Sequence, residues 1–270
     1  METPRVQMNK YNKSGLYTLF NRGPSYFRLN SCLLVMLVCI AQPVHARQPP
    51  TLVLNDAFAP PYTTTAHDGF LDIVVSEALR RLGVNLKLIK LPPERALINA
   101  NAGLEDGELS RIAGLEKLYP NLMRVPEKLL DFEFAAFSKD PNIPANWDSI
   151  RQYSVGHIRG WKFYEYHMKG AGVMLTATSP RQLFQLLDKD RIKVALYARW
   201  MGQAQLRQMG IKGVYQLKPV LAKREMFIYL NKRHARLVPR IDQALKDLKR
   251  EGFYKRTAEE KLFPYAKGPL

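Results

Sequence analysis

The stretch that decides the fold runs from residue 52 to residue 111. It reads LVLNDAFAPPYT (52–63), GFLDIVVSEALRRLG (69–83), NLKLIKL (85–91), PPERALINANAG (92–103) and EDGELSR (105–111). A short apolar run, a proline-rich loop, a segment with helical periodicity, a second apolar run and another helix follow one another. This order predicts an α/β fold with mostly parallel strands. Ligands bind beyond the carboxyl ends of such strands, so the loops after Leu54 and around Gly107 are candidate binding loops.

The first 46 residues differ from the rest of the chain. They hold five Lys or Arg and one acid, and they end in the apolar run SCLLVMLVCIAQPVHA (31–46). We interpret them as a secretory signal cleaved after Ala46, which predicts a periplasmic protein; an uncleaved membrane anchor is the alternative. Both cysteines, Cys32 and Cys39, fall inside this segment, so the mature chain would contain no disulfide and no thiol nucleophile.

The mature chain is basic. The whole sequence holds 41 basic and 24 acidic residues, so removing the signal leaves 36 and 23, a formal charge of +13. The charges are spread along the chain rather than collected in one run, which favours a solvated basic surface over a nucleic-acid arm. We therefore expect no nucleic-acid partner.

Signals for catalysis or for a bound cofactor are weak. The five histidines show no HxH or HxxxH spacing, and the chain contains no GxSxG motif and no phosphate-binding loop. We expect no metal, no cofactor and no catalytic residues, and hence a protein that is not an enzyme. An exported enzyme on the same scaffold is one alternative, and it would require a buried acid such as Glu94 or Glu105.

The first lobe supplies five candidate ligand-binding residues. Asp56, Phe58 and Tyr62 lie in the loop after the first strand, where two consecutive prolines prevent both helix and sheet pairing. Ser110 and Arg111 follow Gly107, and we expect a glycine turn there to offer free N–H groups beside a hydroxyl and a guanidinium. Such a set can hold a carboxylate.

The ordered set DAFAPPYT, GFLDIVVSEALRRLG, a strand, a helix ending ANAG, and a turn with Ser and Arg resembles the first lobe of bacterial extracellular solute-binding proteins of family 3. These are periplasmic receptors of polar amino acid ABC transporters. The resemblance implies the type II periplasmic binding protein-like fold, with two lobes of mostly parallel sheet flanked by helices and a two-strand hinge. It also implies a monomer that binds a small molecule and presents it to a membrane permease or receptor. We expect residues 47–131 and 226–270 in lobe 1, and 132–225 in lobe 2.

The second lobe supplies candidates by their position in the resembling family. The loop after the predicted strand 153–158 contains Arg159, Gly160, Trp161 and Lys162, and Tyr197 ends a later strand. Amino acid receptors usually place an aspartate just after that later strand to hold the ligand's ammonium, but this chain reads VALYARW (194–200). An unpaired cation is costly to bury, so a carboxylate-bearing or aromatic metabolite is a better prediction than an ordinary amino acid. A ligand sensor that signals through a membrane receptor is a second alternative.

Overall fold

The fold is described from a computed structural model, which defines residues 49–266. The described residues belong to one compact unit. The predicted signal, residues 1–46, therefore lies outside the described residues. Within 49–266, no helix combines the length and the apolar character needed to cross a membrane.

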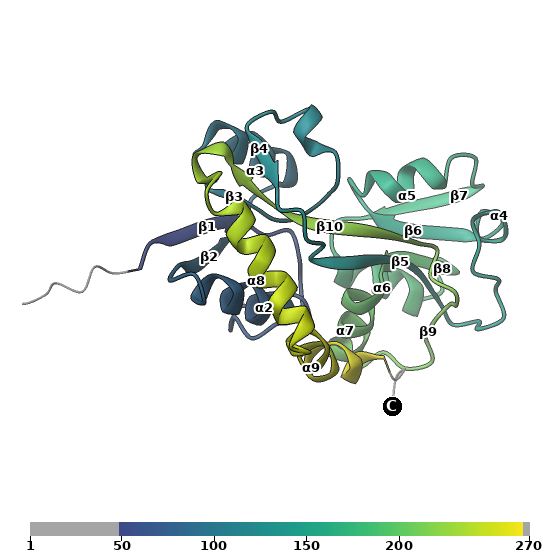
Figure 1. Ribbon diagram of the computed structural model, residues 1–270. Helices are drawn as coiled ribbons and strands as arrows, with labels where there is room; N and C mark the ends of the chain where they lie inside the picture. The colour runs from purple at the N-terminus through teal and green to yellow at the C-terminus, as the bar shows by residue number, and fades with distance from the viewer. Residues whose placement is uncertain (1–48, 267–270) are drawn as a thin grey trace, which may run out of the picture. The chain divides into compact units, whose positions relative to one another are not determined.

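The strands form one continuous path in the order β2-β1-β3-β10-β5-β8-β6-β7, with β4 beside β10 and β9 beside β5. The path has two halves, which we call lobe 1 and lobe 2 (Figure 1). In lobe 1 three strands are parallel, β1 (Thr51–Asn55), β2 (Asn85–Ile89) and β3 (Gly107–Ile112). In lobe 2 another three are parallel, β6 (Ser154–Ile158), β7 (Val173–Ala177) and β8 (Val194–Ala198).

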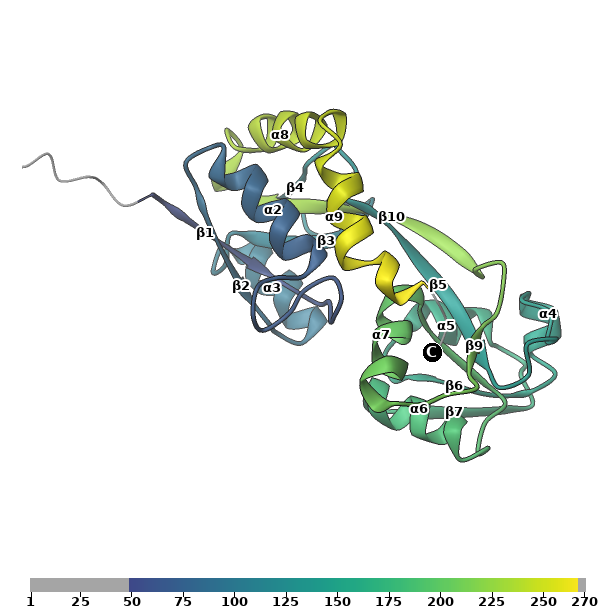
Figure 2. The same ribbon diagram turned by 90° about the horizontal axis from the view of Figure 1, so that it is seen from below.

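Two long strands connect the lobes, β5 (Leu130–Ser138) and β10 (Ala222–Asn231). They pair antiparallel with each other from Leu130 to Phe134, after which β10 continues along β3 and β5 continues along β8. Figures 1 and 2 show this pair running between the two groups of elements. The predicted two-strand hinge is thus confirmed, although the returning strand begins at Ala222 and not at the predicted Met226.

Helices cover the sheet in both lobes. Lobe 1 contains α2 (Phe70–Arg80), α3 (Pro93–Ala102), α8 (Val238–Arg250) and α9 (Phe253–Lys261), with the short strand β4 (Leu122–Arg124) and the 3₁₀ turns η1 (Leu115–Lys117) and η2 (Lys232–His234). Lobe 2 contains α4 (Trp147–Ile150), α5 (Lys162–His167), α6 (Pro180–Asp188), α7 (Arg199–Met209) and the short strand β9 (Tyr215–Gln216). In lobe 1, helix α2 packs against α8 and α9. In lobe 2, helix α6 packs against α7.

Local sequence signals explain where several helices begin and end. Gly103 and Gly210 adopt the left-handed conformation directly after α3 and α7, which ends each helix. The Ser179 hydroxyl accepts a hydrogen bond from the Gln182 N–H, so Ser179 caps α6. The apolar stripe of α2, including Leu71, is fully buried in the core.

The predicted glycine turn before Ser110 is wrong. Gly107 begins strand β3, whose backbone pairs with β1 on one side and with β10 on the other. A Cβ at Gly107 would lie 2.0 Å from the Tyr229 carbonyl oxygen, so glycine is required by the close approach of β10 and not by a turn. The N–H groups that we expected to be free along 107–111 belong to a sheet.

The carboxyl-terminal residues contact both lobes. Helix α9 packs on α2, and the 3₁₀ turn η3 (Phe263–Tyr265) that follows it contacts α7. The Phe263 ring stacks on Trp200 with centroids 6.0 Å apart, and Arg207 Nη1 donates to the Pro264 carbonyl oxygen at 3.2 Å. This end of the chain therefore forms a third link between lobe 1 helices and lobe 2.

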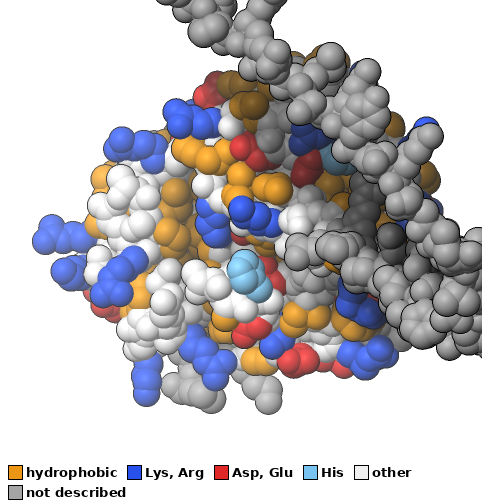
Figure 3. Space-filling view, turned by 90° about the vertical axis from the view of Figure 1, so that its left-hand side faces the viewer, with side chains coloured by type: hydrophobic (Ala, Val, Ile, Leu, Met, Phe, Trp, Pro, Cys, Tyr) orange, Lys and Arg blue, Asp and Glu red, His pale blue; other side chains and the backbone are white. Residues whose placement is uncertain are grey.

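Lysine and arginine side chains are distributed over the surface. Figure 3 shows them spread across one face, separated by apolar and neutral side chains, with no single basic patch. This distribution agrees with the solvated basic surface expected from the sequence.

Candidate functional site

Four of the predicted ligand-binding residues meet in one group of rings. We call it the aromatic cluster, and its members are Phe58, Tyr62, Phe132, Phe134, Trp161, Phe163, Tyr164 and Tyr197. Phe58, in the loop after β1, lies 5.5 Å from Phe132 on hinge strand β5, measured between ring centroids. Phe132 lies 6.2 Å from Trp161, and Trp161 lies 4.8 Å from Tyr197. The cluster thus joins lobe 1, the hinge and lobe 2.

Most rings of the cluster are buried against one another. Phe58, Tyr62 and Tyr197 are 6%, 2% and 3% exposed, whereas Trp161 is half-buried. Burial raises the pKa of the Tyr62 and Tyr197 hydroxyls far above their usual range, so both remain protonated. Trp161 and Phe163, both half-buried, are therefore the more accessible of the rings named here.

Tyr164 fixes the second-lobe part of the cluster. Its hydroxyl lies 2.7 Å from the Tyr197 carbonyl oxygen and 3.1 Å from both the N–H and the carbonyl oxygen of Ala135. Its ring lies parallel to that of Trp161, at 5.8 Å and an interplanar angle of 5°. One buried side chain thus ties α5 to β5 and β8 and supports Trp161 from behind.

Arg111 lies beside a buried acid that the sequence analysis did not identify. Its Nε and Nη2 are each 2.6 Å from Glu108 Oε2, and Nη2 is 3.4 Å from the Pro93 carbonyl oxygen. Asn55 Nδ2 donates to the other Glu108 oxygen at 3.2 Å. The Glu108 side chain is 1% exposed and that of Arg111 is 16% exposed, so the guanidinium is the accessible half of the pair.

Polar capacity remains unused around this pair. The Ser110 hydroxyl and the Asn55 Oδ1 are buried and make no hydrogen bond within the described part of the chain. Burial raises the pKa of Glu108, although the Arg111 charge and the hydrogen bonds from Arg111 and Asn55 act in the opposite direction. These residues come from the carboxyl end of β1 and from β3, where the α/β rule places a ligand.

Asp56 has a structural partner on each oxygen. Oδ1 accepts the Phe58 N–H at 2.8 Å, and Oδ2 lies 3.1 Å from Lys90 Nζ. Lys90 also donates to the Phe58 carbonyl oxygen. Asp56 is 3% exposed, so in this structure it shapes the loop that carries Phe58.

The second-lobe loop is exposed and only partly engaged. Gly160 has a positive φ of 83° and its N–H donates to Glu165 Oε1 at 3.0 Å. Lys162 is the first residue of α5, not a loop residue, and its Nζ lies 2.8 Å from Glu165 Oε2. Arg159 is exposed at the end of β6. Gly160 and Lys162 thus share Glu165, and within residues 49–266 neither of them forms a hydrogen bond or an ion pair with Arg111.

Arg199 follows strand β8, where the sequence analysis noted that amino acid receptors usually place an aspartate. This chain therefore has a positive charge at that position instead of a negative one. Arg199, at the start of α7, places Nη1 2.8 Å from Glu133 Oε2, and Lys223 Nζ lies 2.9 Å from Glu133 Oε1. Glu133 alternates with Phe132 and Phe134 along β5, yet the charges of Glu133 and Arg199 both act on the Tyr62 hydroxyl, so the triad lies beside the aromatic cluster. Two cations on one carboxylate leave no free negative charge for a ligand ammonium.

Other candidate sites are not supported. Among residues 49–266, no three His, Cys, Asp or Glu side chains gather as a metal site would require. A cavity of about 220 Å³ lies at the far end of β5 in lobe 2, beside Lys139 and Lys193, and none of the predicted site residues lines it. Glu94 is exposed, which removes it as the buried acid that the enzyme alternative requires.

Comparisons with known proteins support the fold. No family model matches the sequence. An uncharacterized protein of Shewanella oneidensis is 26% identical over 202 residues, which cover 72% of this chain and 76% of that protein.

Among solved structures, a histidine kinase sensor domain with similarity to periplasmic binding proteins matches with a TM-score of 0.65 and 18% identity, over 80% of this chain and 97% of that one. An amino acid ABC transporter substrate-binding protein from Streptococcus pneumoniae, bound to L-arginine, matches with a TM-score of 0.62 and 13% identity, over 80% and 95% of the two chains. The GluR0 ligand-binding core in complex with L-glutamate matches with a TM-score of 0.66 and 11% identity, over 81% of this chain and 99% of that one. The described chain therefore has the two-lobed fold of periplasmic binding proteins.

Proposed function

We propose that this protein is a periplasmic solute-binding receptor, a divergent relative of family 3, that captures a small carboxylate-bearing or aromatic metabolite between its lobes. The aromatic cluster is the observation that carries the proposal. It brings the loop after β1, a hinge strand and the second-lobe loop into one set of contacts, so a change of hinge angle changes all of them together. In this account, residues 1–46 are the export signal, and the lobes divide at residues 131 and 226.

The ligand class follows from the charges. Arg111 is the accessible cation at the carboxyl ends of β1 and β3, and its guanidinium suits a carboxylate. The Glu133 triad, with two cations on one acid, supplies no anchor for an ammonium. Trp161 is a half-buried aromatic residue of the second-lobe loop, which suits contact with a planar or aromatic group.

A thermal-shift screen tests this proposal. The purified protein is unfolded in urea and refolded to remove carried-over ligand, then heated with phenylacetate, succinate, L-glutamate, L-phenylalanine and L-arginine. A ligand at a hundred times its Kd stabilises the folded protein by about 2.7 kcal/mol, which raises the Tm of a protein of this size by roughly 5–10 °C. We expect phenylacetate or succinate to produce the largest shift.

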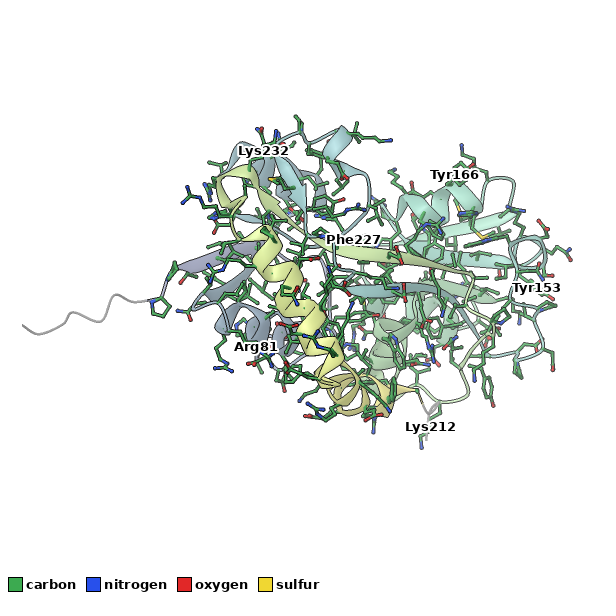
Figure 4. The ribbon with its side chains drawn as sticks, in the orientation of Figure 1. Arg81, Tyr153, Tyr166, Lys212, Phe227 and Lys232 are labelled. Atoms are coloured by element: carbon green, nitrogen blue, oxygen red, sulfur yellow. The ribbon has the colours of Figure 1, made fainter. Side chains whose placement is uncertain are left out.

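Two variants locate the binding. Arg111→Gln should weaken carboxylate binding at least tenfold, because it removes a charge-assisted hydrogen bond of about 1.5–3 kcal/mol. Arg81→Gln is the matched control, because Arg81 also pairs with acids but lies at the end of α2, where Figure 4 labels it. A panel without any shift would contradict the proposal, and so would equal binding by wild type and Arg111→Gln.

A sensing role is the second candidate, because a structural neighbour is a histidine kinase sensor domain. The transport role and the sensing role can be distinguished by measuring the uptake of a radiolabelled compound from the panel that binds the protein. Loss of uptake on gene deletion supports delivery to a transporter, whereas intact uptake with a lost transcriptional response to the compound supports sensing.

A further inference from the structure

The neutral ion pair at Arg111 poses a charge problem for any anionic ligand. Glu108 and Arg111 are within 2.6 Å of each other, and their charges already cancel. A carboxylate that binds the exposed side of the guanidinium leaves two negative charges around one positive charge. Because Glu108 is almost completely buried, this excess charge has little solvent to screen it.

Two residues with unused polar atoms, Asn55 and Ser110, bear on the protonation state of Glu108. Asn55 now donates its amide N–H to Glu108 Oε1, while its own Oδ1 is buried without a hydrogen-bond partner in the described residues. The same Nδ2 also donates to the Ala96 carbonyl oxygen at 3.3 Å and to the Gly107 carbonyl oxygen at 3.5 Å, so a half-turn that offers Oδ1 to a protonated Glu108 gives up these two contacts. Ser110, two residues further along β3, also has a buried hydroxyl without a partner in the described residues, which can accept a hydrogen bond or donate one.

We propose that an anion binding at Arg111 is taken up together with one proton, which Glu108 receives. The proton comes from solvent and forms an O–H bond on Glu108, so the loaded site holds one cation, one anion and one neutral acid. This inference rests on the proposed function and concerns the same site. It makes Glu108 a positioning residue that holds Arg111 while the site is empty and releases it when the ligand arrives.

The charged and titratable groups around Glu108 agree with this direction. On its own strand Arg111 lowers the pKa of Glu108, and an anion on the guanidinium would weaken that effect. Glu105, just before β3, acts to raise the pKa of Glu108. Strand β1 contributes the neutral Asn55, the paired residue on β10 is Tyr229, and α3 contributes the Pro93 carbonyl near the guanidinium.

Linkage fixes the expected pH dependence. The pKa of Glu108 is higher in the complex than in the free protein, so affinity is greatest below the free pKa. Affinity then falls roughly tenfold per pH unit between the free and the bound pKa, and it levels off above the bound pKa. An ordinary arginine site without a coupled acid shows no such slope once the ligand's own carboxylate is ionised.

Calorimetry measures the proton directly. Phenylacetate and succinate are titrated into the refolded protein from pH 5 to pH 8, in pairs of buffers with different enthalpies of ionisation. The difference in heat between buffers gives the number of protons taken up. We expect a maximum approaching one proton per bound anion in wild type, and about zero with Glu108→Gln, whose Kd should be independent of pH.

The control is Glu127→Gln, because Glu127 also forms an ion pair of 2.6 Å, with Lys249, but contacts none of the site residues. It should show the wild-type proton uptake. Binding of phenylacetate or succinate without proton uptake in wild type would overturn the inference and leave the receptor function intact. Failure of both compounds and of the whole screening panel to bind would overturn the receptor function, and the inference with it. The wild-type measurement decides the question even where Glu108→Gln does not fold.

Discussion

Tyr164→Phe removes one hydroxyl from the junction of α5, β5 and β8. The Tyr164 side chain is fully buried, and its hydroxyl donates to the Tyr197 carbonyl oxygen at 2.7 Å while accepting the Ala135 N–H at 3.1 Å. The phenylalanine ring fills nearly the same space. The loss is therefore confined to the hydrogen bonds that the hydroxyl makes with two buried backbone groups, which also face each other across the β5–β8 pair.

The magnitude follows from these two groups. A buried donor or acceptor that loses its partner costs about 1–3 kcal/mol. We expect Tyr164→Phe to lower the free energy of unfolding by about 1–3 kcal/mol, which corresponds to roughly 2–12 °C in Tm for a protein of this size. Burial raises the pKa of the Tyr164 hydroxyl well above its usual range, so it stays a donor and the effect should not vary between pH 6 and pH 9.

Urea unfolding, followed by circular dichroism and by tryptophan fluorescence, measures this difference. The matched control is Tyr166→Phe, one half-turn further along α5, because Tyr166 is 67% exposed and projects outward in Figure 4. The control should change the free energy of unfolding by less than about 0.5 kcal/mol. A Tyr164→Phe protein as stable as the control would refute the role assigned to this hydroxyl.

Further stability predictions concern strand β3 and helix α2. Gly107→Ala should lower the free energy of unfolding by about 3 kcal/mol or more in urea unfolding, because its Cβ would lie 2.0 Å from a backbone oxygen of β10, whereas Gly172→Ala, which meets open space, should be nearly neutral. Hydrogen bonds from Arg80 and then Arg81 lower the pKa of Glu77 from 4.5 to about 2. The stabilisation by Glu77 is therefore present above pH 4.5 and lost as the pH falls toward 2, and Glu77→Gln should flatten this part of the stability curve in acid titrations. If the free energy of unfolding of Glu77→Gln fell with pH in acid as steeply as that of the wild type, other groups would be responsible for the pH dependence.

The helices of this fold could be predicted from the sequence because their signals are local. Gly103 and Gly210 end helices whose apolar positions recur with helical period, and Ser179 followed by proline begins another. These residues act on their own backbone, so no knowledge of distant segments is needed.

Strand β3 could not be predicted because its cause is distant in the sequence. The letters EDGELSR favour a turn, and only the approach of β10, more than a hundred residues later, converts them into a strand between two neighbours. Strand β7 was missed for a related reason. Its residues Val173 to Thr176 are exposed, so no alternation marks them, and pairing with β6 alone defines the strand.

The roles of the candidate site residues stay predictions, and their contacts could not be predicted. The proline-rich loop indicated Phe58 and Tyr62 as candidates, and the expected glycine turn indicated Arg111. Which rings they would meet depends on β5, and which acid Arg111 would meet depends on the burial of Glu108, a property of the assembled sheet. An acid three residues before an arginine in an otherwise apolar strand is the signal that could have suggested this pair.

A crystal structure with the panel compound that produces the largest thermal shift tests the central claim most directly. The account predicts that the compound's carboxylate lies at about 3 Å from the Arg111 guanidinium, with Trp161 against its apolar part. A compound bound elsewhere, for example in the cavity beside Lys139, with Arg111 still in contact with Glu108 alone, would contradict it.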